Sequence, residues 1–166
     1  MTRALNALWL LNALLARAAK FTVVMFTATM VASIVWQVFT RVFFNRSPPW
    51  TEEVALLMFT WIVLIMVAVG VREHLHVRVD ALLKVLPIPF ADMAERILSL
   101  LIAAIGGYLL WSGLDHLREM HGATSAAIRY PAELLYMSMP VASVLICLFA
   151  IENAIRGDLA KRGAAA

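Results

Sequence analysis

The chain has 166 residues, of which 63% are hydrophobic and 15% are charged, and its formal net charge is +3. A soluble domain of this length could not bury so much apolar surface. The single cysteine, Cys147, excludes an intramolecular disulfide and a multi-cysteine metal cluster. The charges fall almost entirely outside four long apolar runs. The composition therefore predicts a membrane protein, and the excess positive charge is interpreted as a topology signal rather than as nucleic-acid binding.

Each apolar run is long enough to cross the hydrocarbon layer, about 30 Å thick, as an α-helix. The runs lack the alternating pattern of membrane barrel strands. We therefore expect an all-α fold, an integral membrane four-helix bundle that forms one domain over residues 1–166. With their flanking turns, the membrane spans are predicted at residues 21–44, 52–72, 92–120 and 132–154.

Residues 1–20 precede the first span and show an amphipathic pattern. Leu8, Leu11 and Leu15 share one helical face, whereas Arg17 and Lys20 lie on another. The segment loosely resembles a secretory signal, but this amphipathic pattern favours a helix that lies in the cytoplasmic interface of the membrane.

The first connection between spans contains Pro48 and Pro49, which break the helix before Trp50. Thr51 can cap the second span, and Glu52 and Glu53 then occupy its first turn, where carboxylates interact favourably with the helix dipole. The alternative is that one of the two acids pairs with a basic group on a neighbouring helix or on a partner subunit. The sequence leaves both roles open.

The second connection contains an amphipathic stripe that predicts a second interfacial helix over residues 75–88. Pro87 ends this helix. Arg72, His76 and Asp80 are close enough in sequence to form a polar cluster that ties it to the end of the second span. We expect that cluster to be structural.

The third and fourth spans carry features that affect helix packing. Gly106 and Gly107 with Ala103 give a small-residue face at Ala103 and Gly107 that permits close helix approach, either within the chain or with another subunit. Pro140 is expected to bend the fourth span, with Ser138 or Ser143 available to satisfy the carbonyl groups that the bend frees.

Lysine and arginine are unevenly distributed among the connections. Ten of the fourteen lie in the amino terminus, the second connection and the carboxy terminus, and four lie in the first and third connections. Because basic residues accumulate on the cytoplasmic side, both termini are predicted to be cytoplasmic.

The sequence offers no catalytic constellation. His74 and His76 lie at one end of the predicted spans, whereas His116 and His121 lie at the other, so they cannot share a metal ion. The apolar cores of the spans contain no histidine for haem, and the chain has no phosphate-binding glycine loop. We therefore expect no enzymatic activity, no cofactor and no metal site.

A small autonomous exporter is the more serious alternative, because such a protein could also have four helices. It needs an ionisable group at membrane depth, and none of the four apolar runs contains Asp, Glu, Lys or Arg. The chain is therefore interpreted as a structural membrane protein that does not itself form a translocation path.

The residues around the second span resemble a known family, the DctQ-like small membrane subunits of tripartite ATP-independent periplasmic (TRAP) transporters. The resemblance lies in the order and spacing of one set of residues. This set is Arg41, Phe44, Asn45, Trp50, Thr51, Glu52, Glu53, Trp61, Arg72, His76, Asp80 and Pro87.

The resemblance implies a non-catalytic scaffold partner of a large TRAP permease subunit in the inner membrane of a bacterium. It implies uptake of organic acids, driven by an ion gradient that is usually sodium, with a periplasmic binding protein that delivers the substrate. Membrane lipids are the other expected partners, and nucleic acid is not one. The alternative from another class is a membrane anchor or assembly subunit of a respiratory complex.

Two groups of residues are candidates for contacts with these partners. The family-motif residues are expected to act as structural or interface positions, with Glu53 beside Trp50 foremost among them. The docking surface for the binding protein is expected at the outer end of the third span, at Asp115, His116, Arg118 and Glu119.

Overall fold

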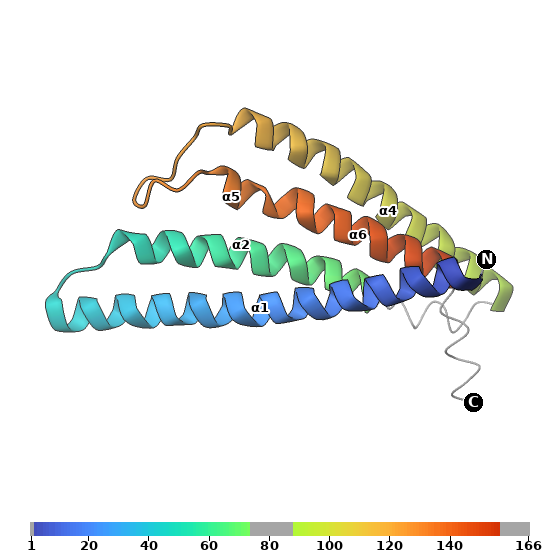
Figure 1. The fold of residues 1–166 in the computed structure, drawn as a ribbon, viewed down its shortest axis with the longest axis horizontal. Coiled ribbons are helices and arrows are strands. Elements are labelled where there is room, and N and C mark those ends of the chain that lie inside the picture. The colour runs from blue at the N-terminus through green and yellow to red at the C-terminus, as the bar shows by residue number, and fades with distance from the viewer. Residues whose placement is uncertain (1, 74–87, 157–166) are drawn as a thin grey trace.

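The computed structural model describes residues 2–73 and 88–156 (Figure 1). These residues form the helices α1 (Thr2–Phe44), α2 (Pro49–Arg72), α4 (Ile88–Glu119), α5 (Glu133–Tyr136) and α6 (Ser138–Arg156). Within the described parts of the chain, four helical segments are long and apolar enough to cross a membrane, and they are Trp9–Phe44, Pro49–Arg72, Arg96–Glu119 and Glu133–Ile155. The predicted all-α membrane fold with four spans is confirmed.

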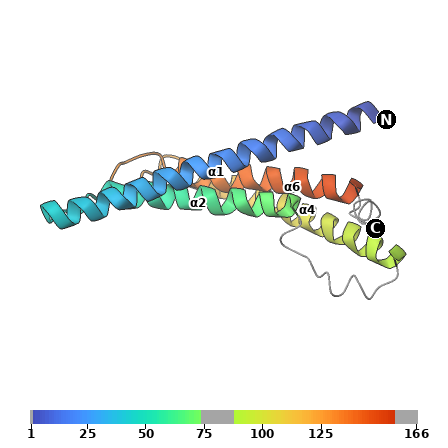
Figure 2. The same cartoon turned by 90° about the horizontal axis from the view of Figure 1, so that it is seen from below.

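The four long helices lie in an open row. Helix α2 packs between α1 and α6, and α6 packs between α2 and α4, so α1 and α4 lie at opposite edges (Figure 1). In the view turned by 90°, α1 and α4 diverge toward the end that carries the N-terminus (Figure 2). The bundle is therefore opened out, and each edge helix has one long helical neighbour over most of its length.

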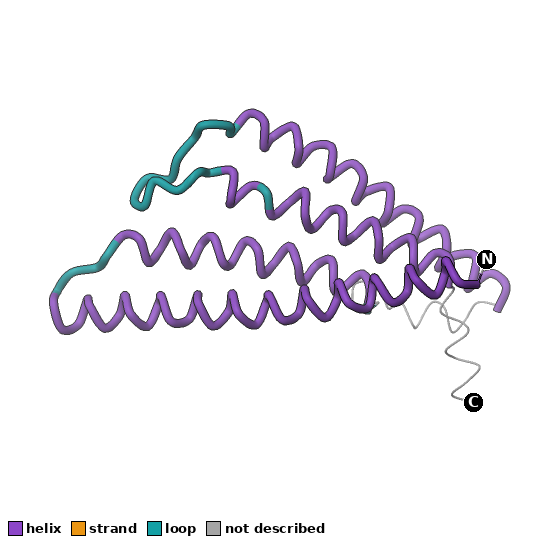
Figure 3. The backbone as a smooth tube through the Cα atoms, viewed as in Figure 1, coloured by secondary structure: helices purple, strands orange, loops and turns teal. Residues whose placement is uncertain are grey.

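The connections divide the molecule into two ends. The α1–α2 and α4–α5 connections lie together at one end, called here the loop end (Figure 3). The first residues of α1 and the last residues of α2 and α6 lie at the other, called here the terminal end (Figure 1). Because successive long helices run in opposite directions, residues far apart in the sequence meet at each end.

Helix α1 is continuous, so the predicted division at residues 20 and 21 does not interrupt it. The reason is local, because no glycine or proline occurs between Thr2 and Phe44. Asn12, Ala16 and Ala19 are buried, so this part of α1 packs into the row. At about 1.5 Å per residue, α1 exceeds the hydrocarbon layer, so α1 is tilted or extends beyond it.

The buried apolar residues form two clusters between α1, α2 and α6, nearer the terminal end. Small side chains bring the helix backbones close, as is usual in membrane helices. Phe149 is the largest fully buried side chain of the first cluster. The first cluster consists of Ala16, Ala68, Val71, Ile146, Phe149 and Ala150, and the second of Ala19, Ile65 and Val69.

The contact between α4 and α6 depends on glycine. A Cβ atom on Gly106 would lie 2.9 Å from Cys147 Sγ, and one on Gly113 would lie 3.2 Å from Pro140 Cδ. A Cβ atom on Gly107 would meet nothing within 4 Å. Ala103 packs against the first core cluster. Within this chain Gly106 therefore makes the close approach, and packing of the Ala103 and Gly107 face against another subunit stays a prediction.

The predicted bend at Pro140 appears as an interruption between α5 and α6 at Met137. Pro140 has no N–H group to donate to the carbonyl of Tyr136, so the helix cannot continue regularly through this turn. The Ser138 hydroxyl donates to the Leu135 carbonyl at 2.6 Å, and the Ser143 hydroxyl donates to the Met139 carbonyl at 2.8 Å. The two serines thus bond carbonyl oxygens on either side of the bend, whereas the carbonyl that Pro140 leaves without its helical donor is that of Tyr136.

The predicted interfacial helix over residues 75–88 lies outside the described residues except for its last position. Helix α4 begins there, at Ile88, four residues before the predicted start of the third span. Pro89 falls in its first turn, where a missing N–H group costs no helical hydrogen bond.

Candidate functional site

Glu53, in the first turns of α2, holds the connection between α4 and α5. Its carboxylate accepts hydrogen bonds from the Ser125 hydroxyl at 2.8 Å and from the backbone N–H groups of Ala127 at 2.7 Å and Ile128 at 2.9 Å. Hydrogen bonds to a charged acceptor are shorter and stronger than those between neutral groups. The Glu53 carboxylate thus holds a loop more than seventy residues away in the sequence, and these three hydrogen bonds are called here the clamp. This role differs from the two that the sequence left open, which were helix capping and pairing with a basic group.

The loop that Glu53 clamps is a short hairpin-like turn, defined here as residues 123–132 and called the outer hairpin. Thr124 and Pro131 form an isolated antiparallel bridge. The Ser125 N–H donates to the Tyr130 carbonyl at 3.0 Å, and the Ala132 N–H donates to the Ala123 carbonyl at 2.9 Å. The hairpin therefore has its own ladder in addition to the clamp.

Tyr130 lies in this hairpin beside the clamp. Burial raises the pKa of its phenol above the ordinary value of 10.0, and the charge of Glu53 and the proximity of Tyr136 raise it further. The direction of this shift follows from the partial burial of the phenol and from its position beside the Glu53 carboxylate.

Glu52 forms a second contact at the loop end, between α1 and α2. Gln37 donates from Nε2 to the Glu52 carboxylate at 2.7 Å and to the Ser47 hydroxyl at 3.1 Å. Thr51 is fully buried and donates to the carbonyl of Pro48 at 2.7 Å, whereas the helix begins at Pro49. The predicted helix cap at Thr51 is therefore wrong, because the prolines start the helix earlier.

Trp61 joins α2 to α5 and α1. Its indole N–H donates to the Leu134 carbonyl at 2.9 Å, a group near the interruption before Pro140. The ring of Phe26 meets the indole edge to face, at 6.2 Å between centroids. Indole suits such a position, because one edge donates a hydrogen bond while the ring packs in apolar surroundings.

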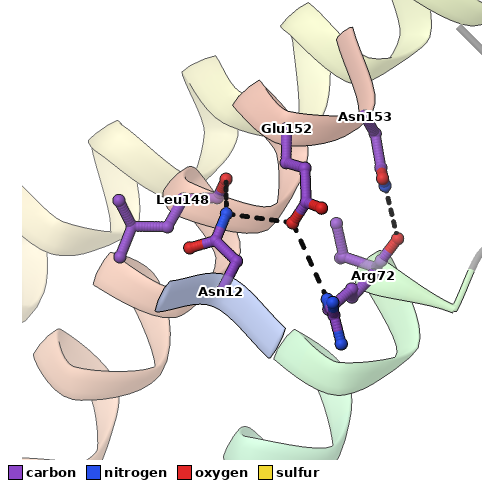
Figure 4. A network of polar contacts seen from close by, with 6 residues as sticks. Asn12, Arg72, Leu148, Glu152 and Asn153 are labelled. Atoms are coloured by element: carbon purple, nitrogen blue, oxygen red, sulfur yellow. Dashed lines mark hydrogen bonds and ion pairs between the residues drawn. The ribbon is translucent and has the colours of Figure 1, made fainter. Parts of the chain in front are cut away.

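A polar cluster lies at the terminal end, where α1, α2 and α6 meet (Figure 4). Glu152 accepts a hydrogen bond from Asn12 Nδ2 at 2.9 Å and faces Arg72 Nε at 3.7 Å. The exposed fraction of the side chain is 4% for Glu152 and 24% for Arg72. Asn153 donates to the Val71 carbonyl at 2.8 Å. These contacts fix three helices at one point.

Two further interactions lie at this end. The guanidinium of Arg72 lies 5.7 Å from the ring centroid of Phe149, within the range of a cation–π contact. Lys20 and Glu73 form an ion pair nearer the surface, with side chains 51% and 40% exposed. The buried pair joins α2 to α6, and the surface pair joins α1 to the end of α2 with greater access to water.

No sequence pattern indicated Asn12, Glu152 or Asn153 as site residues. One feature could have indicated Glu152, because it follows an apolar run and lies one turn from Phe149 on the helix. An acidic residue at the edge of a membrane span is expected to have a partner. The sequence predicted His76 and Asp80 around Arg72, but both lie outside the described residues, as does Pro87.

The remaining predicted residues lie at the loop end. Arg41 and Trp50 are exposed. At the end of α4, Asp115 and Arg118 are exposed too. The other two predicted docking residues, His116 and Glu119, approach each other at 3.5 Å between Nδ1 and Oε2, and the imidazole meets the ring of Tyr136 edge to face at 4.8 Å.

Residues 30–159 match the family described as the DctQ component of tripartite ATP-independent periplasmic transporters. The chain is 28% identical over 118 residues to the isethionate TRAP transporter permease protein DctMQ of Oleidesulfovibrio alaskensis, a match that covers 70% of this chain and 18% of that protein.

Two relatives carry the name C4-dicarboxylate TRAP transporter small permease protein DctQ. The one from Rhodobacter capsulatus is 29% identical over 104 residues, which cover 59% of this chain and 44% of the relative. The one from Vibrio cholerae is 32% identical over 68 residues, which cover 41% of this chain and 29% of the relative. The chain thus matches less than half the length of each of these three relatives.

Proposed function

The chain belongs to the DctQ component family of tripartite ATP-independent periplasmic transporters, and from this membership we propose that it is the small membrane subunit that braces a larger permease. The match over residues 30–159 carries the proposal. The relatives are transporter subunits and not enzymes. Membership in this family implies partnership with a large permease.

The DctMQ relative supports a partnership with a much larger membrane protein. The segment similar to this chain makes up only 18% of that relative, so a small-subunit segment and a far longer remainder share one polypeptide there. In our proposal the large subunit carries the substrate and ion sites. It uses an ion gradient, sodium in the first instance, to take up an organic acid that a periplasmic binding protein delivers.

The distribution of polar contacts supports a bracing role. The contacts of Glu53 and Glu52 lie at the loop end, and the contacts of Glu152 and Arg72 lie at the terminal end. The middle parts of the four apolar runs contain no Asp, Glu, Lys or Arg. A chain that moved an ion through its own helices would need an ionisable group between these ends.

We propose that the protein is a multi-pass protein of a bacterial inner membrane, with both termini and the terminal end in the cytoplasm. The excess of lysine and arginine in the segments at that end supports this orientation. The loop end then faces the periplasm. We also keep Asp115, His116, Arg118 and Glu119, at the outer end of α4, as a proposed docking region for the binding protein.

The test is purification of the tagged chain from its native host after extraction in a mild detergent. The proposal expects a large multi-span permease as a stoichiometric partner, and uptake of an organic acid in vesicles only when both subunits and the binding protein are present. Purification with a quinone-reactive or cofactor-bearing enzyme would overturn it. Ion-coupled transport by this chain alone in vesicles would overturn it as well.

A further inference from the structure

His121 and Glu133 meet across the base of the outer hairpin. His121 lies just after the end of α4, and Glu133 is the first residue of α5. The imidazole Nδ1 lies 2.6 Å from Oε1 of the carboxylate. The N–H group of Gly122 donates to the same oxygen at 3.4 Å. The segment after α4 therefore directs two polar groups at one carboxylate of α5.

This pair adds a side-chain contact to the backbone contacts of the hairpin. The ladder between the two arms ends at the hydrogen bond from the Ala132 N–H to the Ala123 carbonyl. His121 and Glu133 lie directly outside that bond in the sequence. The clamp from Glu53 acts nearer the tip, on residues 125–128. The base and the tip of the hairpin are thus held by different side chains.

The pair is accessible to protons from water, because the side chain of His121 is 83% exposed and that of Glu133 is 34% exposed. The two residues form an ion pair only while the imidazole is protonated. Histidine ordinarily changes its charge between about pH 5 and pH 8, whereas a glutamate ordinarily stays ionised down to about pH 4. The ion pair is therefore present at mildly acidic pH and is lost as the pH rises through the range of histidine.

The other titratable groups around the hairpin do not link α4 to α5 in this way. His116 has its carboxylate partner Glu119 on the same helix, at 3.5 Å, so that pair joins no two elements. The ring of His116 meets the ring of Tyr136 in a contact that does not require a charge. Burial raises the pKa of Tyr130 above 10.0, so this phenol stays protonated at neutral pH.

The remaining charged side chains on the elements next to the hairpin are carboxylates and guanidinium groups. Neither type ordinarily titrates in the range of histidine. These residues are Glu53 on α2, Asp115, Arg118 and Glu119 on α4, and Arg129 in the hairpin.

We propose that His121 and Glu133 form a pH-sensitive latch, which fastens the end of α4 to α5 at mildly acidic pH and releases it as the pH rises. Helix α5 is separated from α6 at Met137, and its Leu134 carbonyl is bound by the indole of Trp61 on α2. The latch adds a second, pH-dependent attachment to the one that Trp61 provides. This device belongs to the chain itself and goes beyond the proposed function.

The experiment uses the full chain in nanodiscs of phosphatidylcholine and measures amide hydrogen exchange at about pH 5.5 and about pH 7.5, on either side of the ordinary histidine pKa. Exchange at residues 122–134 is divided by the chemical rate of an unstructured peptide at the same pH. The resulting protection factor reports local opening of the hairpin base and removes the direct effect of pH on exchange.

Three variants isolate the charge of the imidazole. His121→Gln keeps a hydrogen-bond donor that cannot become charged, and His121→Lys carries its charge at both pH values. His116→Gln is the matched control, because it removes the histidine whose carboxylate partner lies on its own helix.

We expect the wild type to show about threefold higher protection at the lower pH, a size that suits an exposed ion pair. His121→Gln should lose this difference, and His121→Lys should show the higher protection at both pH values. His116→Gln should keep the difference, even if its absolute protection is lower. A wild type without the difference overturns the inference. A difference that persists in His121→Gln or His121→Lys overturns it too, as does its loss in His116→Gln.

These outcomes are independent of the proposed function, because the measurement needs neither the permease nor a substrate. Failure of the chain to purify with a large permease leaves the latch intact. Failure of the latch leaves the proposed partnership intact.

Discussion

The Ser125 hydroxyl donates a 2.8 Å hydrogen bond to the Glu53 carboxylate and so joins the outer hairpin to the start of α2. The two residues are 72 positions apart in the sequence. The same carboxylate also bonds two backbone N–H groups of the hairpin. One side chain of α2 therefore helps to hold the connection between α4 and α5 in place.

Glu53→Gln is expected to loosen the outer hairpin, because a neutral amide oxygen accepts hydrogen bonds more weakly and its NH₂ group cannot accept any. Amide hydrogen exchange at residues 125–128 should become faster, on the order of tenfold. Exchange measured by mass spectrometry on the protein in detergent checks this prediction.

The matched control is Glu52→Gln, next in the chain, whose carboxylate bonds Gln37 and not the hairpin. Exchange at residues 125–128 should be unchanged in this variant. Equal acceleration in both variants would show that general loosening of α2, and not the clamp, is responsible.

Glu152→Leu is expected to destabilise the protein by about 3–5 kcal/mol, because it leaves the partly buried Arg72 and the buried Asn12 without their acidic partner. The double variant Arg72→Met with Glu152→Leu should recover part of this loss, because no unpaired charge remains. Unfolding monitored by circular dichroism in mixed micelles gives the free energies.

The surface pair of Lys20 and Glu73 provides the comparison for the buried pair. Glu73→Gln should change the free energy of unfolding by about 0–1 kcal/mol, because water and salt screen an exposed pair. A cost for Glu152→Leu as small as that for Glu73→Gln would refute the structural importance of the buried cluster.

Gly106→Ala is expected to separate α4 from α6 and to lower the free energy of unfolding by about 1–3 kcal/mol. The added Cβ atom would lie 2.9 Å from Cys147 Sγ and 3.0 Å from Ile146 Cγ2. Gly107→Ala is the control, because its Cβ atom meets nothing within 4 Å. It should be neutral, or stabilising by about 0.5–1 kcal/mol through helix propensity. If Gly107→Ala is the more damaging variant, the packing described for α4 and α6 is wrong.

The raised pKa of Tyr130 predicts a pH dependence for the outer hairpin. Because the folded state favours the protonated phenol, its contribution to stability is fully present below the ordinary pKa of 10.0. It is lost as the pH rises through the higher pKa of the folded state. Phenolate absorbance should show that Tyr130 titrates later than an ordinary tyrosine, with the late component absent from Tyr130→Phe.

The charge of Glu53 contributes to this shift, so Glu53→Gln should move the late titration toward lower pH. Superimposable titration curves for wild type and Tyr130→Phe, after correction for one phenol, would contradict the prediction.

The sequence by itself determined the four spans and the helical class, and its motif around the second span indicated the family that the comparison confirms. Hydropathy is sufficient to predict the spans and the helical class, because in lipid each helix satisfies its own backbone hydrogen bonds. The formation of each helix therefore depends only on residues near one another in the sequence. The same local rule explains the continuous α1, whose length follows from the absence of proline and glycine, although its amphipathic start suggested a separate helix.

Only the tertiary structure decided which partners the polar residues have. Glu52 and Glu53 are neighbours with the same chemistry, yet one faces Gln37 of α1 and the other faces the outer hairpin. Arg72 pairs with Glu152, eighty residues away, because the open row brings α2 beside α6. Such pairs depend on the order in which the helices pack, and the hydropathy of a span does not specify which other span lies beside it.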